Sequence, residues 1–567
     1  MRSNNSTSDR GTRTVIGAPP PMSLTRYQGP WTKKEAGHLL KRCLFGPNQK
    51  QIDEAVSLGL EATVEMLFNN ATPHDPPVRY TLSEPDPDAN FFAVVDDPNV
   101  AYGETWVNES PIINTGNAML DNQILQYRSN SVLAWVYLNM TEDKISILPK
   151  MWLFWHNHFV VSEFRIPLQY YQYSALIEKH AIGNFREFTK EMTIDASMLL
   201  YLNGNENVKQ APNENYAREL LELFTIGKGD LAGPGDYTTF TEQDVIEMAR
   251  VLTGWQIDLS VINEKISTVF RPIMHDTGSK QLSPRFGNAV IGNGGDQEYA
   301  QLIDVIFQQE EVAKFICRKL YRYFVNYEIT DEINAEVIDP MAMILRANDY
   351  DVTPVIKALI SSEHFFGEEV FGCMIKNPAD FMLSATRSLN YAADPDPKVS
   401  HFFALIYAVL ARELDLDIFF HADVAGWKAY YQEPQFYRIW INSHLLPKRN
   451  AISTAFAAGG TIPINGGNAN VVPFLNIIDY ISTIPDALDP YELIKGINRH
   501  LFTYDLGDAQ VEYLRQILIP GLPAQSWTME YSEFLADPFN IAIRTSINNK
   551  LKDLMSAILE MPEFQLM

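Results

Sequence analysis

The segment Ile145–Val161 constrains the fold of this 567-residue chain more than any other. It is apolar at nearly every position around a helical wheel, so it has no broad polar stripe that would face water. A helix of this kind is stable only where other elements surround it. We therefore predict a central helix here, in a protein whose other elements pack around it.

Helical spacing of apolar residues also occurs on both sides of this segment. Thr32 is a good helix cap, and the apolar residues that follow it recur at spacings of three and four until Gly46-Pro47. The same periodicity predicts further helices over 49–58, 60–68, 297–307, 309–325, 331–347 and 352–361.

Three stretches interrupt the helical pattern. Residues 70–118 are dense in Pro, Asp, Asn and Gly, residues 256–295 carry several glycines, and 459–470 is rich in Gly and Asn. We expect a long, partly irregular excursion at 70–118, short strands within 256–295 and a break in the helical pattern at 459–470. The fold class predicted is mainly α: a multi-helix globular bundle with long irregular loops and at most minor β structure.

Composition along the chain predicts three parts. Residues 1–30 are polar and have the character of a flexible N-terminal tail. Residues 31–370 form a helical core that carries the polar motifs described below. Residues 371–567 continue in the same helical style, and we expect them to form a C-terminal helical region packed on the core.

Charge and hydropathy limit the classes of partner. The formal charge of −25 argues against nucleic acid and against an anionic membrane surface, both of which attract basic proteins. We find no apolar run long enough to span a membrane and no apolar signal core near Met1. We therefore expect a cytoplasmic protein, although export by another route remains open.

The first polar motif is the helix that follows Pro212. Asn213 can cap it, and Gly227 can end it. Glu219 and Glu222 are three residues apart, so both carboxylates can approach one metal ion. Alternatively, Glu222 pairs with Arg218 four residues earlier, and the polar side of the helix faces solvent.

A second motif places two histidines among aromatic residues near the end of the apolar helix. His156 and His158 are candidate metal ligands, and His158 is also a candidate acid or base. On a regular helix their side chains point about 200° apart, so both can bind one metal only where the helix is broken. The alternative is ordinary hydrogen bonding of one ring in the core and of the other near the surface.

A third motif lies in the loop region after a predicted capped helix. Thr241 and Asp244 have capping-box spacing, and capping explains Asp244 without a catalytic role. His275, Asp276 and Lys280 then follow within six positions of a loop, where catalytic side chains are frequent. The alternative is a turn in which Asp276 serves the backbone.

Several familiar catalytic signatures are absent from the sequence. It contains no Gly-rich phosphate loop, no nucleophile elbow and no HExxH motif. This lowers the expectation of a nucleotide enzyme, a serine hydrolase of the usual kind or a zincin.

Together these motifs resemble the bacterial domain-of-unknown-function 1800 family. The resemblance covers about residues 31–450 and rests on the following segments: 36–47, 156–159, 213–227, 240–245, 249–255, 275–280, 316–321 and 362–366. One departure is the segment His421–Trp427, which stands where the family often has a Pro-Pro pair before Val-x-Gly-Trp. The resemblance implies no particular reaction. It implies, by association only, a companion protein of the alkaline-phosphatase fold.

Two functional hypotheses follow. The first is a metal-dependent or acid/base enzyme, with a divalent metal ion as its cofactor and a site between central helices. Its catalytic residues would be His158, Glu219, His275, Asp276 and Lys280, and its metal ligands would be His156, His158, Glu219 and Glu222. The second is a non-catalytic assembly or binding protein, in which the same residues form a buried structural network. Plausible further members of that network are Arg42, Arg218 and Arg250.

Overall fold

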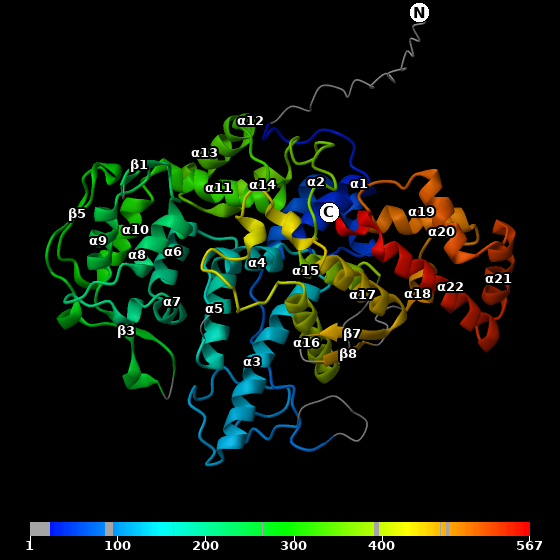
Figure 1. Ribbon diagram of the computed structural model, residues 1–567, viewed down its shortest axis with the longest axis horizontal. Coiled ribbons are helices and arrows are strands. Elements are labelled where there is room, and N and C mark those ends of the chain that lie inside the picture. Colours follow the sequence, from blue (N-terminus) through cyan, green and yellow to red (C-terminus); the bar gives the residue numbers. More distant parts are fainter. Residues whose placement is uncertain are drawn as a thin grey trace, which may run out of the picture.

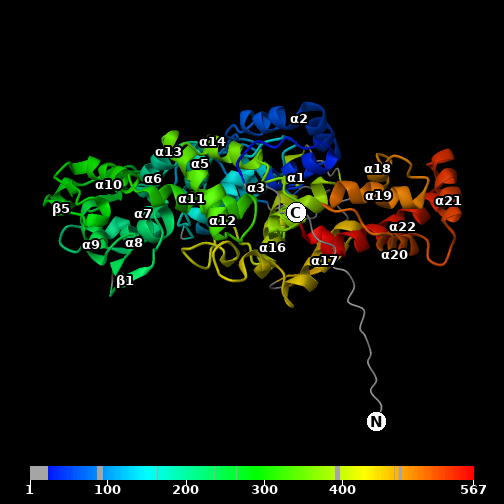
Figure 2. The same ribbon diagram turned by 90° about the horizontal axis from the view of Figure 1, so that it is seen from above.

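The computed structural model describes residues 23–85, 94–162, 164–234, 236–262, 265–389, 396–464, 467–471 and 476–567. Within them the chain is mainly α, and its strands form only two-stranded antiparallel sheets, which confirms the predicted fold class. The molecule is elongated, with a central body between two lobes at opposite ends (Figures 1 and 2). None of the described helices is both long and apolar enough to cross a membrane.

The central body contains the predicted apolar helix, α4 (Leu148–His158), which is buried along almost its whole length. It packs against α3 (Ala118–Thr141) and α5 (Pro167–His180), and Tyr323 of α11 (Glu310–Phe324) donates a 2.9 Å hydrogen bond to the carbonyl oxygen of Lys150. The central position that the sequence predicted is therefore confirmed.

The chain enters the central body through α1 (Lys33–Cys43). Thr32 caps this helix in a capping box with Glu35, as the sequence predicted for Thr32. The next helix, α2 (Gln49–Asn69), is interrupted at Gly59, whose φ of 82° breaks the helix into the two pieces expected from the sequence. The remaining elements of the central body are α12 (Asp331–Ile333), the π-helix η7 (Asn334–Ile338), α13 (Asp339–Ala347), α14 (Val352–Ile360) and α15 (Pro378–Arg387).

The first lobe lies at the left of Figure 1 and carries most of the polar motifs. Its helices are α6 (Phe185–Thr193), α7 (Ala196–Tyr201), η1 (Gly204–Glu206), α8 (Asn215–Glu219), the π-helix η2 (Leu220–Thr225), α9 (Glu242–Val251) and α10 (Glu298–Ile306). Short 3-10 turns connect them: η3 (Leu259–Val261), η4 (Pro272–Met274), η5 (Pro284–Phe286) and η6 (Gly295–Gln297).

Three small sheets belong to this lobe. Their paired strands are β1 (Leu231–Gly233) with β2 (Asp236–Tyr237), β3 (Trp255–Ile257) with β4 (Thr268–Phe270), and β5 (Lys280–Gln281) with β6 (Val290–Ile291). The last two pairs lie within 256–295 or at its edge, so the short strands expected there are confirmed.

The chain after α15 runs from the centre to the right of Figure 1, where its last helices form the second lobe. It contains α16 (Pro397–Glu413), η8 (Lys428–Tyr430), η9 (Phe436–Trp440), α17 (Leu445–Ala458), β7 (Gly460–Ile464), β8 (Gly467–Val471), α18 (Ile477–Ile481), α19 (Pro490–Leu501), α20 (Asp508–Leu518), α21 (Ala524–Ala536), α22 (Ile541–Glu560) and η10 (Pro562–Gln565). The Gly- and Asn-rich break is therefore the hairpin β7–β8.

The C-terminus returns to the centre of the molecule (Figure 1). Met567 donates a 2.9 Å backbone hydrogen bond to Met374, and Lys376 donates one of 2.9 Å to Gln565. The last residues therefore pair with the segment that leads into α15. The three-part division at residues 30 and 370 stays a prediction.

Candidate functional site

His158 lies at the end of α4, where it contacts the π-helix η2. Its Nε2 lies 3.0 Å from the carbonyl oxygen of Phe224, and its Nδ1 lies 3.1 Å from Nζ of Lys319. A carbonyl oxygen only accepts, so Nε2 carries the hydrogen and Nδ1 accepts from the lysine. Burial first, and then the charge of Lys319, hold the pKa of His158 well below its usual range. Both nitrogens are thus satisfied within the protein.

The π-helix explains why polar side chains are needed at this place. A helix leaves the carbonyl groups of its last turn without partners in the helix itself. Lys319 donates to the carbonyl oxygen of Leu223 at 3.1 Å, while His158 donates to that of Phe224. Burial lowers the pKa of Lys319 to about 7. These two side chains therefore complete the hydrogen bonding of η2.

His156, two residues earlier, faces a different set of partners. Its Nδ1 lies 3.0 Å from the hydroxyl of Tyr173, which itself donates to the carbonyl oxygen of Phe159 at 2.7 Å. Its Nε2 accepts the backbone N–H of Phe419 at 3.1 Å. Burial, and secondarily His421, lower the pKa of His156 well below its ordinary value. The ring is therefore a neutral bridge between α4, α5 and the segment at residue 419.

Between the two histidines, Asn157 holds a turn of the chain more than 260 residues away in the sequence. Its Oδ1 accepts the backbone N–H of Trp427 at 2.8 Å. Gly426 has a φ of +91°, and a Cβ placed on it would lie 2.4 Å from Oδ1 of Asn157. Only glycine fits this close approach. We call His156, Asn157 and His158, with the contacts just described, the α4 hub.

His421 is a residue of this region to which the sequence reasoning gave no role. Its ring packs at a tilt against that of Trp427, with centroids 4.2 Å apart, and its centroid lies 4.6 Å from that of the His156 ring. Neither of its nitrogens has a hydrogen-bond partner among the described residues. Burial lowers its pKa to about 3. Its only signal in the sequence was the departure from the family's Pro-Pro pair.

The two glutamates of the helix after Pro212 behave differently from each other. Oε1 of Glu222 lies 3.1 Å from Nζ of Lys228 and 3.9 Å from Nη1 of Arg218. Arg218 pairs more closely with Glu242, whose Oε2 lies 2.7 Å from its Nη2. Glu219 is partly buried and has no ion pair among the described residues. Burial, Glu222 and Asp423 raise its pKa, against the opposing effect of Arg218.

His275 and Lys280 meet around a carboxylate that the sequence reasoning missed, Glu298. Nε2 of His275 lies 2.9 Å from Oε1 of Glu298, and Nζ of Lys280 lies 2.5 Å from Oε2. The N–H of Gly294 also donates to Oε1, at 2.9 Å. Nδ1 of His275 is 2.8 Å from the carbonyl oxygen of Thr253. Glu298 and Lys280 are 0% exposed. We call this cluster the Glu298 network.

Glu298 escaped notice because it is the first residue of α10. An acidic residue there is usual, since it lies at the positive end of the helix dipole. Nothing in its local sequence shows that it meets side chains 18 and 23 positions away. The third loop residue, Asp276, turns outward from these contacts and pairs with Arg250 at 2.8 Å.

Four of the predicted site residues therefore fall into two groups, whereas Glu219, Glu222 and Asp276 belong to neither. The α4 hub lies in the centre of the molecule, and the Glu298 network lies in the first lobe, near α9, α10 and β5 (Figure 1). Among the described residues, no hydrogen bond or ion pair joins His156 or His158 to Glu219 or Glu222. In the described ranges, no cluster of three or more His, Cys, Asp or Glu side chains is arranged to hold a metal ion.

Comparison with known proteins shows that the sequence profile of one family matches nearly the whole chain. Residues 38–566 match the sequence profile described as "Protein of unknown function (DUF1800)". No curated protein and no solved structure matches the chain.

Proposed function

We propose, from the premise that the chain belongs to the DUF1800 family, that it is a non-catalytic binding or assembly protein. In this proposal the histidines, lysines and carboxylates of the sequence motifs are structural. The α4 hub and the Glu298 network hold distant segments of the chain in fixed positions, so that surfaces elsewhere on the molecule can bind a partner or ligand.

One observation carries this proposal: the polar atoms of most of the buried motif side chains are already occupied by partners in the chain itself. Both nitrogens of His158 and of His275, and both oxygens of Glu298, have such partners. A catalytic acid, base or metal ligand needs an atom that can reach the substrate or ion. These atoms would have to give up a buried hydrogen bond to do so, at a cost of about 1–3 kcal/mol each.

The sequence separation of the partners supports a structural role. His156 is bound to Phe419, His158 to Phe224 and Lys319, and Asn157 to Trp427. Three successive residues thus connect three segments far apart in the chain. Buried polar networks of this kind favour one arrangement of the packed elements when every member is satisfied.

The proposal is tested by stability, because structural and catalytic side chains respond oppositely to replacement. His158→Ala leaves the carbonyl of Phe224 without its donor and removes one of the two partners of the Lys319 amine, so we expect the unfolding midpoint to fall. Removing a catalytic group usually leaves stability unchanged or raises it, since such groups are held in unfavourable surroundings. Thermal unfolding followed by circular dichroism measures the difference.

Glu219→Gln is the matched comparison in the same region. Its carboxylate is partly buried without an ion pair among the described residues, so the neutral amide should be tolerated or stabilising. Elemental analysis of protein purified without chelator and without a His-tag accompanies both variants. Stoichiometric metal that disappears in His158→Ala, with the fold retained, would overturn the proposal.

Glu219 also supplies the one observation that favours an enzyme as a second candidate. A carboxyl group with a raised pKa and no ion pair is suited to general acid catalysis. In that case wild-type protein would turn over a member of a panel of model phosphate, ester and glycoside substrates, and Glu219→Gln would not.

The companion of the alkaline-phosphatase fold is the partner we would examine first for the binding proposal. Co-purification of the two proteins, followed by analytical ultracentrifugation, would detect a stable complex. The cytoplasmic location and the lack of nucleic-acid binding also stay predictions.

A further inference from the structure

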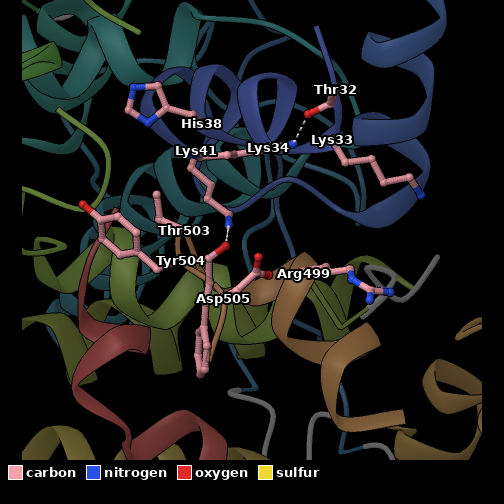
Figure 3. A pocket seen from close by; sticks show the side chains of 10 residues that line it. Thr32, Lys33, Lys34, His38, Lys41, Arg499, Thr503, Tyr504 and Asp505 are labelled. Carbon is pink, nitrogen blue, oxygen red and sulfur yellow. Dashed lines mark hydrogen bonds between the residues drawn. The ribbon is translucent and has the colours of Figure 1, made fainter. Parts of the chain in front are cut away.

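A surface cleft of about 520 Å³ lies where α1 meets the end of α19 and the segment that follows it (Figure 3). Its lining residues are Thr32, Lys33, Lys34, His38, Lys41, Arg499, Phe502, Thr503, Tyr504 and Asp505. We call it the basic cleft. It is separate from the α4 hub and from the Glu298 network. His38 and Lys41 belong to a family motif that the proposed function leaves without a role.

The cleft concentrates positive charge on a protein that is strongly acidic overall. Four of its lining side chains are Lys or Arg and one is a carboxylate, whereas the whole chain carries a formal charge of −25. Nζ of Lys33 lies 2.5 Å from Oδ1 of Asp53, and Nη2 of Arg499 lies 3.9 Å from Oε2 of Glu492. For Lys34 and Lys41, no carboxylate partner lies within ion-pair distance in the described part of the chain. Uncompensated cations in a concave surface attract anions.

Lys41 retains donors for a ligand. Its Nζ donates to the carbonyl oxygen of Phe502 at 2.6 Å, and Figure 3 shows this bond across the cleft. An ammonium group has three hydrogens, so two remain. The bond also fixes the side chain between α1 and the segment after α19. Lys41 is thus positioned before any ligand arrives.

His38 adds an unused hydrogen-bonding atom to the wall of the cleft. Its ring is 2% exposed and is held between Phe365 and Phe371, with centroid distances of 4.8 and 4.2 Å. Nε2 lies 3.1 Å from the carbonyl oxygen of Phe365 and so carries the hydrogen. Nδ1 has no partner among the described residues, and neither does the hydroxyl of Thr503. Unsatisfied buried polar atoms are uncommon in folded proteins and call for an explanation.

We infer that the basic cleft binds a small molecule bearing a phosphoryl or similar tetrahedral oxyanion group. The anion would lie between Lys34, Lys41 and Arg499, the last of which can donate two parallel hydrogen bonds to an oxyanion. Nδ1 of His38 and the hydroxyl of Thr503 are buried, so the cations of the cleft, and not these two atoms, would make the first contacts with the ligand. The volume is in the range of small-molecule sites.

The position of the cleft gives such a ligand a structural consequence. Its walls come from residues 32–41 and residues 499–505, which are opposite ends of the chain. An anion bound to both walls would strengthen their association, which now includes the bond from Lys41 to Phe502 and a 3.3 Å contact between His500 and Pro47. Ligand binding should therefore raise the unfolding temperature of the full chain.

The test is isothermal titration calorimetry of the full-length chain with inorganic phosphate, sulfate and citrate. Ionic strength is held constant with sodium chloride, because exposed charges are screened by salt. We expect saturable binding of phosphate and sulfate. Lys41→Met and Arg499→Gln should each weaken binding by about tenfold or more, the loss typical of a charge-assisted hydrogen bond. Lys209→Gln removes an exposed charge outside the cleft and should change nothing.

Asp505→Asn should change the affinity for anions in the opposite direction. Removing the only carboxylate among the cleft's lining residues should tighten sulfate binding by about twofold or more. Thermal unfolding without anion shows whether each variant is folded, and Arg499→Gln alters an exposed side chain if Lys41→Met fails to fold. Equal heats for wild type and Arg499→Gln would overturn the inference, and so would binding of citrate alone. The cleft shares no residue with the α4 hub or the Glu298 network, so either result leaves the proposed structural role to its own test.

Discussion

The Glu298 network and the basic cleft contain similar side chains and differ in what satisfies them. In the network, Lys280 and His275 share the carboxylate of Glu298, and the group is closed to solvent. In the cleft, Lys41 and His38 bond to backbone carbonyl groups and keep unused donor or acceptor positions. A dense polar motif therefore does not by itself indicate a site. Unsatisfied polar atoms beside a cavity are the stronger indication.

The largest effect should come from removing the shared carboxylate of the network. Glu298→Ala leaves Lys280 and His275 buried without their acceptor, which should lower the free energy of unfolding by about 3–5 kcal/mol. Urea unfolding measures the change. Glu61→Ala is the matched control, because its side chain is 75% exposed and the change should stay within about 0.5 kcal/mol. Similar small losses for both variants would show that the network is not structural.

The next effect concerns His421, which lies beside the α4 hub and should change the stability of the fold in acid. Burial lowers the pKa of His421 to about 3, so between pH 6.5 and pH 4 the unfolded chain takes up a proton that the folded chain does not. Stability from this group is complete above pH 6.5 and is lost as the pH falls, by about 3 kcal/mol at pH 4.

His421→Phe isolates this contribution, because an aromatic ring still packs against Trp427 but no longer titrates. The difference in unfolding free energy between wild type and variant should shift in favour of the variant as the pH falls from 6.5 to 4. A constant difference across that range would contradict the assignment.

Gly426→Ala tests the close approach between the hub and its partner turn. The positive φ and the contact with Asn157 should together cost about 1–3 kcal/mol in unfolding free energy. Gly287→Ala is the control, since Gly287 has a φ of +63° but open space around it. Any excess loss at Gly426 therefore measures the contact. Equal losses at the two positions would show that Asn157 tolerates a larger neighbour.

The smallest expected effect is the pH dependence of anion binding in the basic cleft. Burial lowers the pKa of Lys41 to about 7, so its positive charge is present below pH 7 and is lost above it. Sulfate keeps its charge in this range. Its affinity should therefore fall by about tenfold between pH 6 and pH 8, as a single linked proton requires. Calorimetry at both pH values measures this change.

Other charges close to Lys41 bear on this profile. His38 and His500 have lowered pKa values, that of His500 being about 4, so both are neutral at pH 6 and above. Lys376 is also buried, with a lowered pKa, and Asp505 is the carboxylate among the cleft's lining residues. Lys41→Met should abolish the slope if Lys41 is its source. An unchanged slope in that variant would assign it to Lys376.

Much of the helical framework was predictable because it depends on local rules. Capping by Thr32 and by Thr241, the interruption near Gly59 and the burial of α4 all follow from residue order and apolar spacing. The π-helical turn at Leu220–Thr225 was not predictable in this way, because its carbonyl groups are satisfied by His158 and Lys319 from other helices.

The candidate sites show the same division. Residue type identified His158, His275 and Lys280 as polar side chains that need partners. Their partners Phe224, Thr253 and Glu298 could not be identified, because each contact joins residues separated by at least 18 positions. The predicted metal site required His156, His158, Glu219 and Glu222 to lie close together in space. Residue order alone does not show which distant side chains do so.

The sequence by itself determined the helical class of this protein, the membership of its family and which side chains would need compensation when buried. The tertiary structure decided which of these side chains received a compensating partner. Helix formation depends on neighbours three and four residues apart, whereas desolvation of an ionic group depends on whatever the whole fold brings beside it. For that reason Glu298 closes one cluster of cations, and the cleft between α1 and the end of α19 leaves another open.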